Sequence, residues 1–371
     1  MTTYDTSIQD FPGSINGTDN SSMTTPPRIF TPAELNMAFT AYSFVMTFGA
    51  TFNFFVCYLI LKYRYLRSTI NMLILNLAFS DFFAALMVGP YVFIDIEKSN
   101  IRGTGANILC GLGEGLSLYF IGSLVSLLTL SVLSISRYLV INHPLKFSWR
   151  LQRSHVKYIM CMIWLCALVF ILPQFLSWEY DEEKRSCWRK WAPGVHPIAY
   201  FTATALVCLI VPLTTLSVTY FCTFYTLWLG KTQAILARIR TESRANQYRQ
   251  SIAHKKRAVR LLGFLIIVYI VCWLPFGTYW LLSAVLNYFP DDIPGQHRAF
   301  RITKVTIFIS LCITVINPIV YAFSSRQLRR AAQQALRCRT MNAVSDGIRL
   351  DRIHTVKTKE WDQKTTQTKN L

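Results

Sequence analysis

Residues 258–286 of the chain read AVRLLGFLIIVYIVCWLPFGTYWLLSAVL, and Arg260 is their only charged residue. About 20 apolar helical residues cross the hydrocarbon core of a bilayer, where backbone groups must bond within their own helix. The stretch therefore predicts a membrane-spanning helix. Pro275 removes one backbone hydrogen bond from that helix and predicts a kink in it.

Six further apolar blocks accompany this stretch, and each is long enough to cross a bilayer. They cover residues 38–62, 70–94, 107–139, 156–176, 197–229 and 302–323. Gly, Ser and Thr dilute the third and seventh blocks, and such small residues are common where membrane helices pack together. The predicted fold is an all-α membrane protein, a seven-transmembrane helix bundle over residues 38–323.

The composition agrees with a membrane protein. Hydrophobic residues make up 52% of the chain and charged residues only 15%, against about 25% in soluble domains. The formal net charge is +19, and alternate loops place 28 of the 38 Lys and Arg residues on one side. Positive loops face the cytoplasm, so we expect a multi-pass plasma-membrane protein with its N-terminus outside. No alternation of aromatic and basic residues indicates a nucleic-acid partner.

Both chain ends are polar. Residues 1–37 are rich in Thr, Ser, Asn, Pro and Gly, do not have the pattern expected of a signal peptide, and are expected to be disordered outside the cell. They contain two N-glycosylation acceptors, Asn16 and Asn20. Residues 324–339 have the spacing of a short amphipathic helix on the inner membrane surface, and 340–371 are expected to form a disordered tail. Cys338 is a candidate for palmitoylation, with an unmodified thiol as the alternative.

Two of the ten cysteines are expected on the outer side. Cys110 begins the third apolar block, and Cys187 lies between the fourth and fifth. The other eight lie in apolar blocks or at the inner face, where thiols normally stay reduced. We therefore predict a disulfide between Cys110 and Cys187 that fixes the outer loop across the mouth of the bundle.

Polar residues and prolines inside the spans distinguish a signalling protein from a channel or transporter. Asp81 lies near the middle of the second block, and intramembrane acids are costly and usually functional. Pro212 interrupts the fifth block, and Pro318 follows Asn317 in the seventh. Each proline taken alone predicts only a static kink, whereas the complete set of polar residues and prolines is specific enough to indicate a family.

That set resembles rhodopsin-like (class A) G-protein-coupled receptors along residues 38–338. The matching landmarks are Asn53, Asp81, Ser136-Arg137-Tyr138, Trp164, Pro212 with Tyr220, residues 272–275 (CWLP) and residues 317–321 (NPIVY). The resemblance implies a heterotrimeric G protein as partner and an extracellular ligand, with no enzyme activity. It also implies no cofactor beyond an allosteric sodium ion held by Asp81, Ser126 and Asn317. The residues implied in coupling and switching are Arg137, Tyr138, Tyr220, Trp273, Pro275, Pro318 and Tyr321.

The chain departs from the family pattern in four places. Ser136 stands where an acid usually precedes the arginine, and residues 254–257 (HKKR) are basic where a second acid is common. Both changes remove restraints on Arg137, so we expect raised basal activity. Tyr269 replaces the usual Phe below Trp273. The interval from Cys110 to Arg137 is 27 residues, two longer than usual, which leaves the register of the upper third helix open.

A weaker resemblance, to histamine- and muscarinic-type amine receptors, rests on residues 175–180, 216–221 and 272–276. A protonated amine in an apolar pocket needs a counter-ion. The expected position is Ser117 or Tyr119, depending on the register, and neither is acidic. Glu114 could substitute, or it could be a solvated acid at the mouth. The candidate ligand-binding residues are Glu114, Ser117, Tyr119, Phe120, Thr204, Cys208, Trp273, Phe276, Tyr279, Trp280 and Ile307.

Other functions remain as alternatives. An aromatic cage of Tyr119, Phe120, Phe276, Tyr279 and Trp280 would bind a cation through its ring faces, but it would equally suit a neutral ligand or a peptide side chain. A non-signalling seven-helix scaffold is the alternative that Ser136 leaves open. A photoreceptor is disfavoured, because Leu311 stands where opsins carry their retinal-binding lysine and Lys304 is two turns away. The sequence predicts neither the ligand nor the class of G protein.

Overall fold

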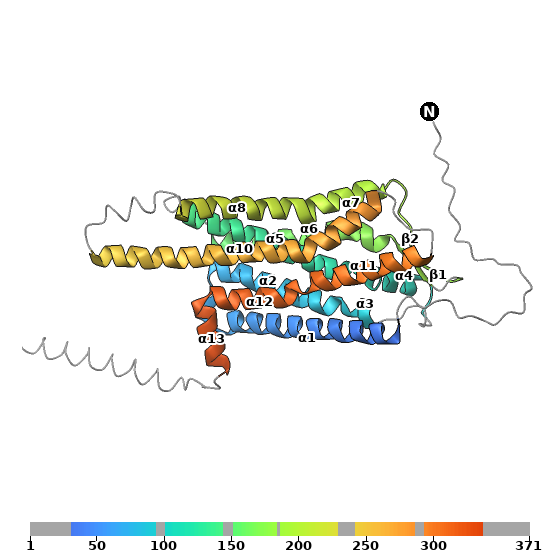
Figure 1. Cartoon of the computed structure of the whole chain (residues 1–371), viewed down its shortest axis with the longest axis horizontal. Coiled ribbons are helices and arrows are strands. Elements are labelled where there is room, and N and C mark those ends of the chain that lie inside the picture. Colours follow the sequence, from blue (N-terminus) through green and yellow to red (C-terminus); the bar gives the residue numbers. More distant parts are fainter. Residues whose placement is uncertain are drawn as a thin grey trace, which may run out of the picture.

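Seven helical segments are long and apolar enough to cross a membrane, in a computed structural model that describes residues 31–93, 101–143, 151–183, 186–228, 242–285 and 293–336. These segments are Ala33–Lys62, Thr69–Phe93, Thr104–Asn142, Arg153–Leu176, Pro197–Trp228, Gly263–Leu282 and Arg301–Ala322. They lie side by side along a common axis (Figure 1). The predicted seven-helix bundle is therefore confirmed.

Twelve helices build this bundle within the described residues, because several spans are made of two pieces. They are α1 (Pro32–Lys62), α2 (Thr69–Met87), α3 (Gly89–Phe93), α4 (Thr104–Leu112), α5 (Ser117–Asn142), α6 (Arg153–Leu176), α7 (Pro197–Ala205), α8 (Val211–Trp228), α10 (Glu242–Val285), α11 (Ile293–Leu311), α12 (Ile313–Ser324) and α13 (Arg326–Leu336). The shorter elements are a 3-10 turn η1 (Arg64–Leu66), a π-helical turn η3 (Leu206–Ile210) and the strands β1 (Trp178–Asp181) and β2 (Ser186–Arg189).

The first helix begins earlier than the apolar block that predicted it. Thr31 caps α1, because its side chain accepts from the Glu34 backbone N–H while the Glu34 side chain accepts from the Thr31 N–H. Pro32 follows in the first helical position, where its missing N–H costs nothing. This capping box is a signal that hydrophobicity alone does not detect.

The two ends of the bundle differ in structure. One end, the hairpin end, carries the antiparallel pair β1 and β2 and the start of α1; the other, the α13 end, carries the short helix after the seventh span (Figure 1). Leu328 and Ala331 on α13 are buried against the core of the bundle. Thus the predicted short helix is present, with its apolar face inward. Asn16, Asn20, Cys338 and the tail 340–371 lie outside the described residues.

The outer faces of the spans are apolar and uncovered. Met162 on α6 is 63% exposed and Phe221 on α8 is 67% exposed. Such faces would be unfavourable in water but match the hydrocarbon of a bilayer. Polar groups lie instead inside the bundle, where Asn53, Asp81 and Asn317 are each at most 1% exposed.

Candidate functional site

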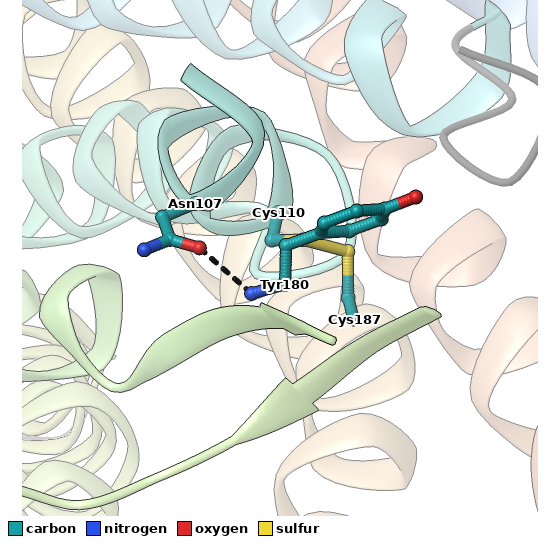
Figure 2. The surroundings of a disulfide bond; sticks show 4 residues. All are labelled: Asn107, Cys110, Tyr180 and Cys187. Atoms are coloured by element: carbon teal, nitrogen blue, oxygen red, sulfur yellow. Dashed lines mark hydrogen bonds between the residues drawn. A yellow bond between two sulfur atoms is a disulfide. The ribbon is translucent and has the colours of Figure 1, made fainter. Parts of the chain in front are cut away.

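A disulfide joins Cys110 on α4 to Cys187 on β2 at the hairpin end of the bundle. Figure 2 shows the two sulfur atoms bonded, at 2.06 Å, beside Tyr180 on the neighbouring strand. The Tyr180 backbone N–H donates to the Asn107 side-chain oxygen at 2.8 Å, which adds a second link between hairpin and α4. The predicted pairing is confirmed, and it holds the hairpin at the start of the third span.

The third span is broken between α4 and α5. Leu116 has a left-handed backbone with φ of 49°, the only such non-glycine residue among those described. The Gln174 side chain, from α6, donates to the Gly115 carbonyl at 2.8 Å and so satisfies a backbone group that the break leaves without a helical partner. The two extra residues between Cys110 and Arg137 are therefore accommodated by a turn within the span.

A cavity of about 50 Å³ lies below the hairpin, between α5, α6, α7 and α10. Six of the eleven candidate ligand-binding residues line it: Phe120, Thr204, Cys208, Trp273, Phe276 and Trp280. Ser123 and Gln174 line it as well, although the sequence did not single them out. Among the described residues around the cavity, none is charged. The site therefore offers aromatic faces and a few neutral hydrogen-bonding groups.

The other five candidates lie elsewhere. Tyr119 is fully buried, with its hydroxyl hydrogen-bonded to Ser310 at 2.7 Å, and the Tyr279 hydroxyl donates to the Ala299 carbonyl at 3.1 Å. Ser117 and Ile307 are buried without lining the cavity. Glu114 is exposed at the break between α4 and α5, and it interacts electrostatically with Lys304.

Below the cavity, a smaller polar space of about 10 Å³ surrounds Asp81. The Asn317 side-chain amide donates to the Asp81 carboxylate at 2.8 Å, and Ser126 is also hydrogen-bonded to that carboxylate. The three residues named for a sodium site are thus brought together. Trp273 lines both this space and the larger cavity, and Ser123 does so too.

Asn76 forms a polar junction that the sequence did not assign. Its amide donates to the Thr129 hydroxyl at 2.7 Å, and the Trp164 indole N–H donates to its carbonyl oxygen at 3.0 Å. Asn53 makes a comparable link, since its amide donates to the Thr314 carbonyl at 2.7 Å. These bonds join α2 to α5 and α6, and α1 to α12. At Asn76, where both the amide and the carbonyl oxygen are hydrogen-bonded, such a buried network fixes one packing arrangement.

At the α13 end, Arg137 is half-buried on α5. It makes no hydrogen bond or ion pair with any residue that the structure describes. Ser136 beside it is 6% exposed. Tyr220 packs closely on Gly263 of α10, where an added Cβ would lie 2.8 Å from the tyrosine ring. The ring of Tyr138 contacts His143.

Pro275 and Pro318 lie inside continuous helices, α10 and α12. Each removes one backbone hydrogen bond without ending its helix, so both positions are local weak points for bending. Tyr321 is buried one turn beyond Pro318. The switch residues named from the sequence therefore follow α5, α8, α10 and α12 from the centre of the bundle to its α13 end.

Comparison with known proteins gives an independent result. The family model described as "7 transmembrane receptor (rhodopsin family)" matches residues 52–321. A pineal opsin from Petromyzon marinus is 26% identical over 79% of this chain and 62% of its own length. A QRFP-like peptide receptor from Branchiostoma floridae is 25% identical over 86% of this chain and 83% of its own. Somatostatin receptor type 2 from Sus scrofa is 28% identical over 92% of this chain and 88% of its own length.

Proposed function

Because the chain belongs to the rhodopsin family of seven-transmembrane receptors, we propose that it passes an extracellular ligand signal to a heterotrimeric G protein. The observation that supports this most is the position of Trp273, which lines both the aromatic cavity and the polar space around Asp81. A ligand that moves this indole changes the packing of the buried polar cluster. Members of this family are receptors and not enzymes.

The signal would travel along α10. This helix of 44 residues carries Trp273 and Pro275 near the cavity and continues past Gly263 at the α13 end. Tyr220 closes against Gly263, so outward movement of this half of α10 would separate the two and open a space beside Arg137. A G protein would bind there, because Arg137 is half-buried and has no acidic partner among the described residues.

The hairpin end would face the outside of the cell. The Cys110–Cys187 disulfide supports this orientation, since such bonds persist in oxidising compartments. The excess of Lys and Arg on the opposite side supports it as well. Asn16 and Asn20 would then be accessible to glycosylation. A glycosidase-sensitive mass shift that disappears in the Asn16→Gln, Asn20→Gln double variant would test this orientation.

The polar space around Asp81 fits a small cation such as sodium. The Asn317 side-chain oxygen is buried without a hydrogen-bond partner among the described residues, and it adjoins the Asp81 carboxylate. A space of about 10 Å³ matches the roughly 10–15 Å³ that one water-sized particle needs. Asp81, Ser126 and Asn317 would hold the ion, which would supply a positive charge that stabilises the packed cluster.

The cavity supports an uncharged ligand moiety more than an amine. None of the described residues that line it is charged, so a protonated amine would be buried without a counter-ion. Glu114 remains the candidate counter-ion, although it lies outside the cavity and interacts with Lys304. A loss of amine response in Glu114→Gln, at unchanged surface expression, would favour the amine alternative.

Nucleotide exchange in a reconstituted system tests the coupling. The purified chain in lipid nanodiscs is mixed with one Gα subunit of each class, and its ligand-free exchange is compared with that of Arg137→Ala. Arg153→Ala, which removes an exposed arginine at the same end, serves as the matched control. We expect Arg137→Ala to abolish exchange and Arg153→Ala to retain it. No exchange with any Gα class would favour the non-signalling scaffold.

A further inference from the structure

Arg189 ends strand β2, where it pairs in register with Trp178 of β1. Its guanidinium carbon lies 4.7 Å from the centre of the Trp178 ring, 5.5 Å from that of Phe201 and 5.8 Å from that of Trp191. Three aromatic rings from the hairpin, the following loop and α7 thus surround one cation. Ring faces attract a guanidinium, which explains how Arg189 is held in place.

Among the described residues, this cation has no acidic partner. The Arg189 side chain makes no hydrogen bond or ion pair with the part of the chain that the structure describes. The nearest acid along the hairpin, Glu179, pairs instead with the exposed Lys190 at 3.1 Å. Burial lowers the pKa of Arg189 to about 10, so the side chain is still charged at neutral pH. Its N–H donors, five on a planar fork, are therefore available to an anion.

The caged arginine is separated from the cavity lining by one aromatic ring, that of Phe201. The Phe201 ring that contacts Arg189 also packs edge-on against Trp280, with ring centres 4.4 Å apart. Trp280 and Thr204, which lies one turn after Phe201, both line the cavity. An anchor for a negative group thus lies beside the hairpin-end wall of a cavity whose described lining is uncharged.

We propose that Arg189 binds the carboxylate of a small amphipathic acid whose apolar body occupies the cavity. A single guanidinium matches the single charge and planar geometry of a carboxylate. The aromatic lining below matches an aryl or alkyl chain. The proposal rests on the receptor function proposed above, because it names the ligand class for the same cavity.

Matched probes test the charge preference without any mutation. The purified full chain in nanodiscs is titrated with phenylbutyrate, phenylbutanol and phenylbutylamine, and its thermal unfolding temperature is followed. We expect phenylbutyrate to stabilise the protein at about tenfold lower concentration than either analogue, the factor that corresponds to about 1.4 kcal/mol. The same comparison between decanoate and decanol shows whether the cavity prefers an acid with an alkyl chain to one with an aryl group. Equal effects of acid, alcohol and amine, or no effect of either acid, would overturn the proposal.

Variants locate the effect. Arg189→Gln is expected to remove the advantage of the acid, and Arg189→Glu to transfer it to phenylbutylamine. Lys190→Gln removes the adjacent exposed cation and should leave the ranking unchanged. Unfolding without probe shows whether each variant is folded. Should Arg189→Gln fail to fold, Arg189→Lys keeps the charge without the planar fork and should show a reduced preference. An acid preference that persists in Arg189→Gln would contradict the proposal.

This experiment separates the two hypotheses, because it contains no G protein. Acid binding through Arg189 in a chain that never catalyses nucleotide exchange would contradict the coupling alone. Exchange that depends on Arg137, without any preference for acids, would contradict only the ligand class.

Discussion

The Tyr269 hydroxyl donates a hydrogen bond to the backbone carbonyl of Cys208 at 2.6 Å. In an uninterrupted α-helix that carbonyl would accept from the N–H four residues later, which is the position of Pro212. Proline has no N–H, and the chain around Cys208 forms the π-helical turn η3 in place of a regular α-helix. Tyr269, itself fully buried, donates to this carbonyl from α10. The tyrosine that departs from the family pattern thus ties the fifth span to the sixth.

Tyr269→Phe should raise ligand-free activity. The hydroxyl bond holds α10 against η3, and outward movement of α10 would break it. A buried hydrogen bond contributes about 1 kcal/mol, so its loss should shift the equilibrium toward the open form about fivefold. The measurement is basal nucleotide exchange at matched receptor concentration.

Tyr225→Phe is the matched control for this change, because Tyr225 is exposed on the neighbouring α8. We expect no change in its basal exchange. Equal or lower basal exchange in Tyr269→Phe would show that the hydroxyl does not restrain α10.

Ser136→Asp should lower ligand-free signalling. Ser136 is buried beside Arg137, which has no acidic partner among the described residues. A carboxylate there would pair with the guanidinium and hold it away from a G protein, and a hydrogen bond to a charged group contributes about 1.5–3 kcal/mol. Signalling in transfected cells, normalised to surface expression, measures the effect. Ser136→Asn introduces a side chain of the size of Asp without its charge and should not lower signalling. Unchanged signalling in Ser136→Asp would refute the expectation.

The seven spans were predictable because membrane insertion depends on a local property, the length of an apolar run. The disulfide followed from the predicted topology, since Cys110 and Cys187 are the only cysteines in segments predicted to lie outside. The cavity-lining positions around Trp273 were also predictable from the sequence. The helix is regular on both sides of this residue, so the side chains expected to point into the bundle do so. Local signals therefore account for the bundle and for the cavity walls contributed by α7 and α10.

The upper third helix was not predictable in the same way. Counting from Cys110 or from Arg137 selected Ser117 or Tyr119, and neither lines the cavity. The break before α5 changes which residues face inward, and Gln174 from a distant part of the chain stabilises it. Arg189 was missed for a related reason. It follows a run of mixed charge that predicts solvation, and only the fold brings Phe201 beside it.

Sodium should stabilise the chain through Asp81. Replacing potassium chloride by sodium chloride at constant ionic strength is expected to raise the thermal unfolding temperature, because the ion would fit the space bounded by Asp81, Ser126 and Asn317. Asp81→Asn should remove this dependence. Thr306→Val changes a buried hydroxyl of the seventh span away from that space and should keep it. Equal unfolding temperatures of the wild type in both salts would exclude a sodium site.

Gly115→Ala should destabilise the break in the third span. A Cβ at this position would lie 2.5 Å from the Gly111 carbonyl oxygen and 2.6 Å from the Trp178 indole nitrogen. The Gly111 carbonyl belongs to the backbone and cannot rotate away, so the turn between α4 and α5 must shift. Overpacking of this kind costs about 1–3 kcal/mol.

The matched control is Gly89→Ala, also within a span, where the added Cβ would make its nearest contact at 3.4 Å with the flexible Met46 side chain. Thermal unfolding in nanodiscs should show a lower unfolding temperature for Gly115→Ala and little change for Gly89→Ala. Because Gln174 both stabilises the break and lines the cavity, Gly115→Ala should also weaken stabilisation by phenylbutyrate. Equal unfolding temperatures for the two variants would mean that the third span does not depend on a close approach at Gly115.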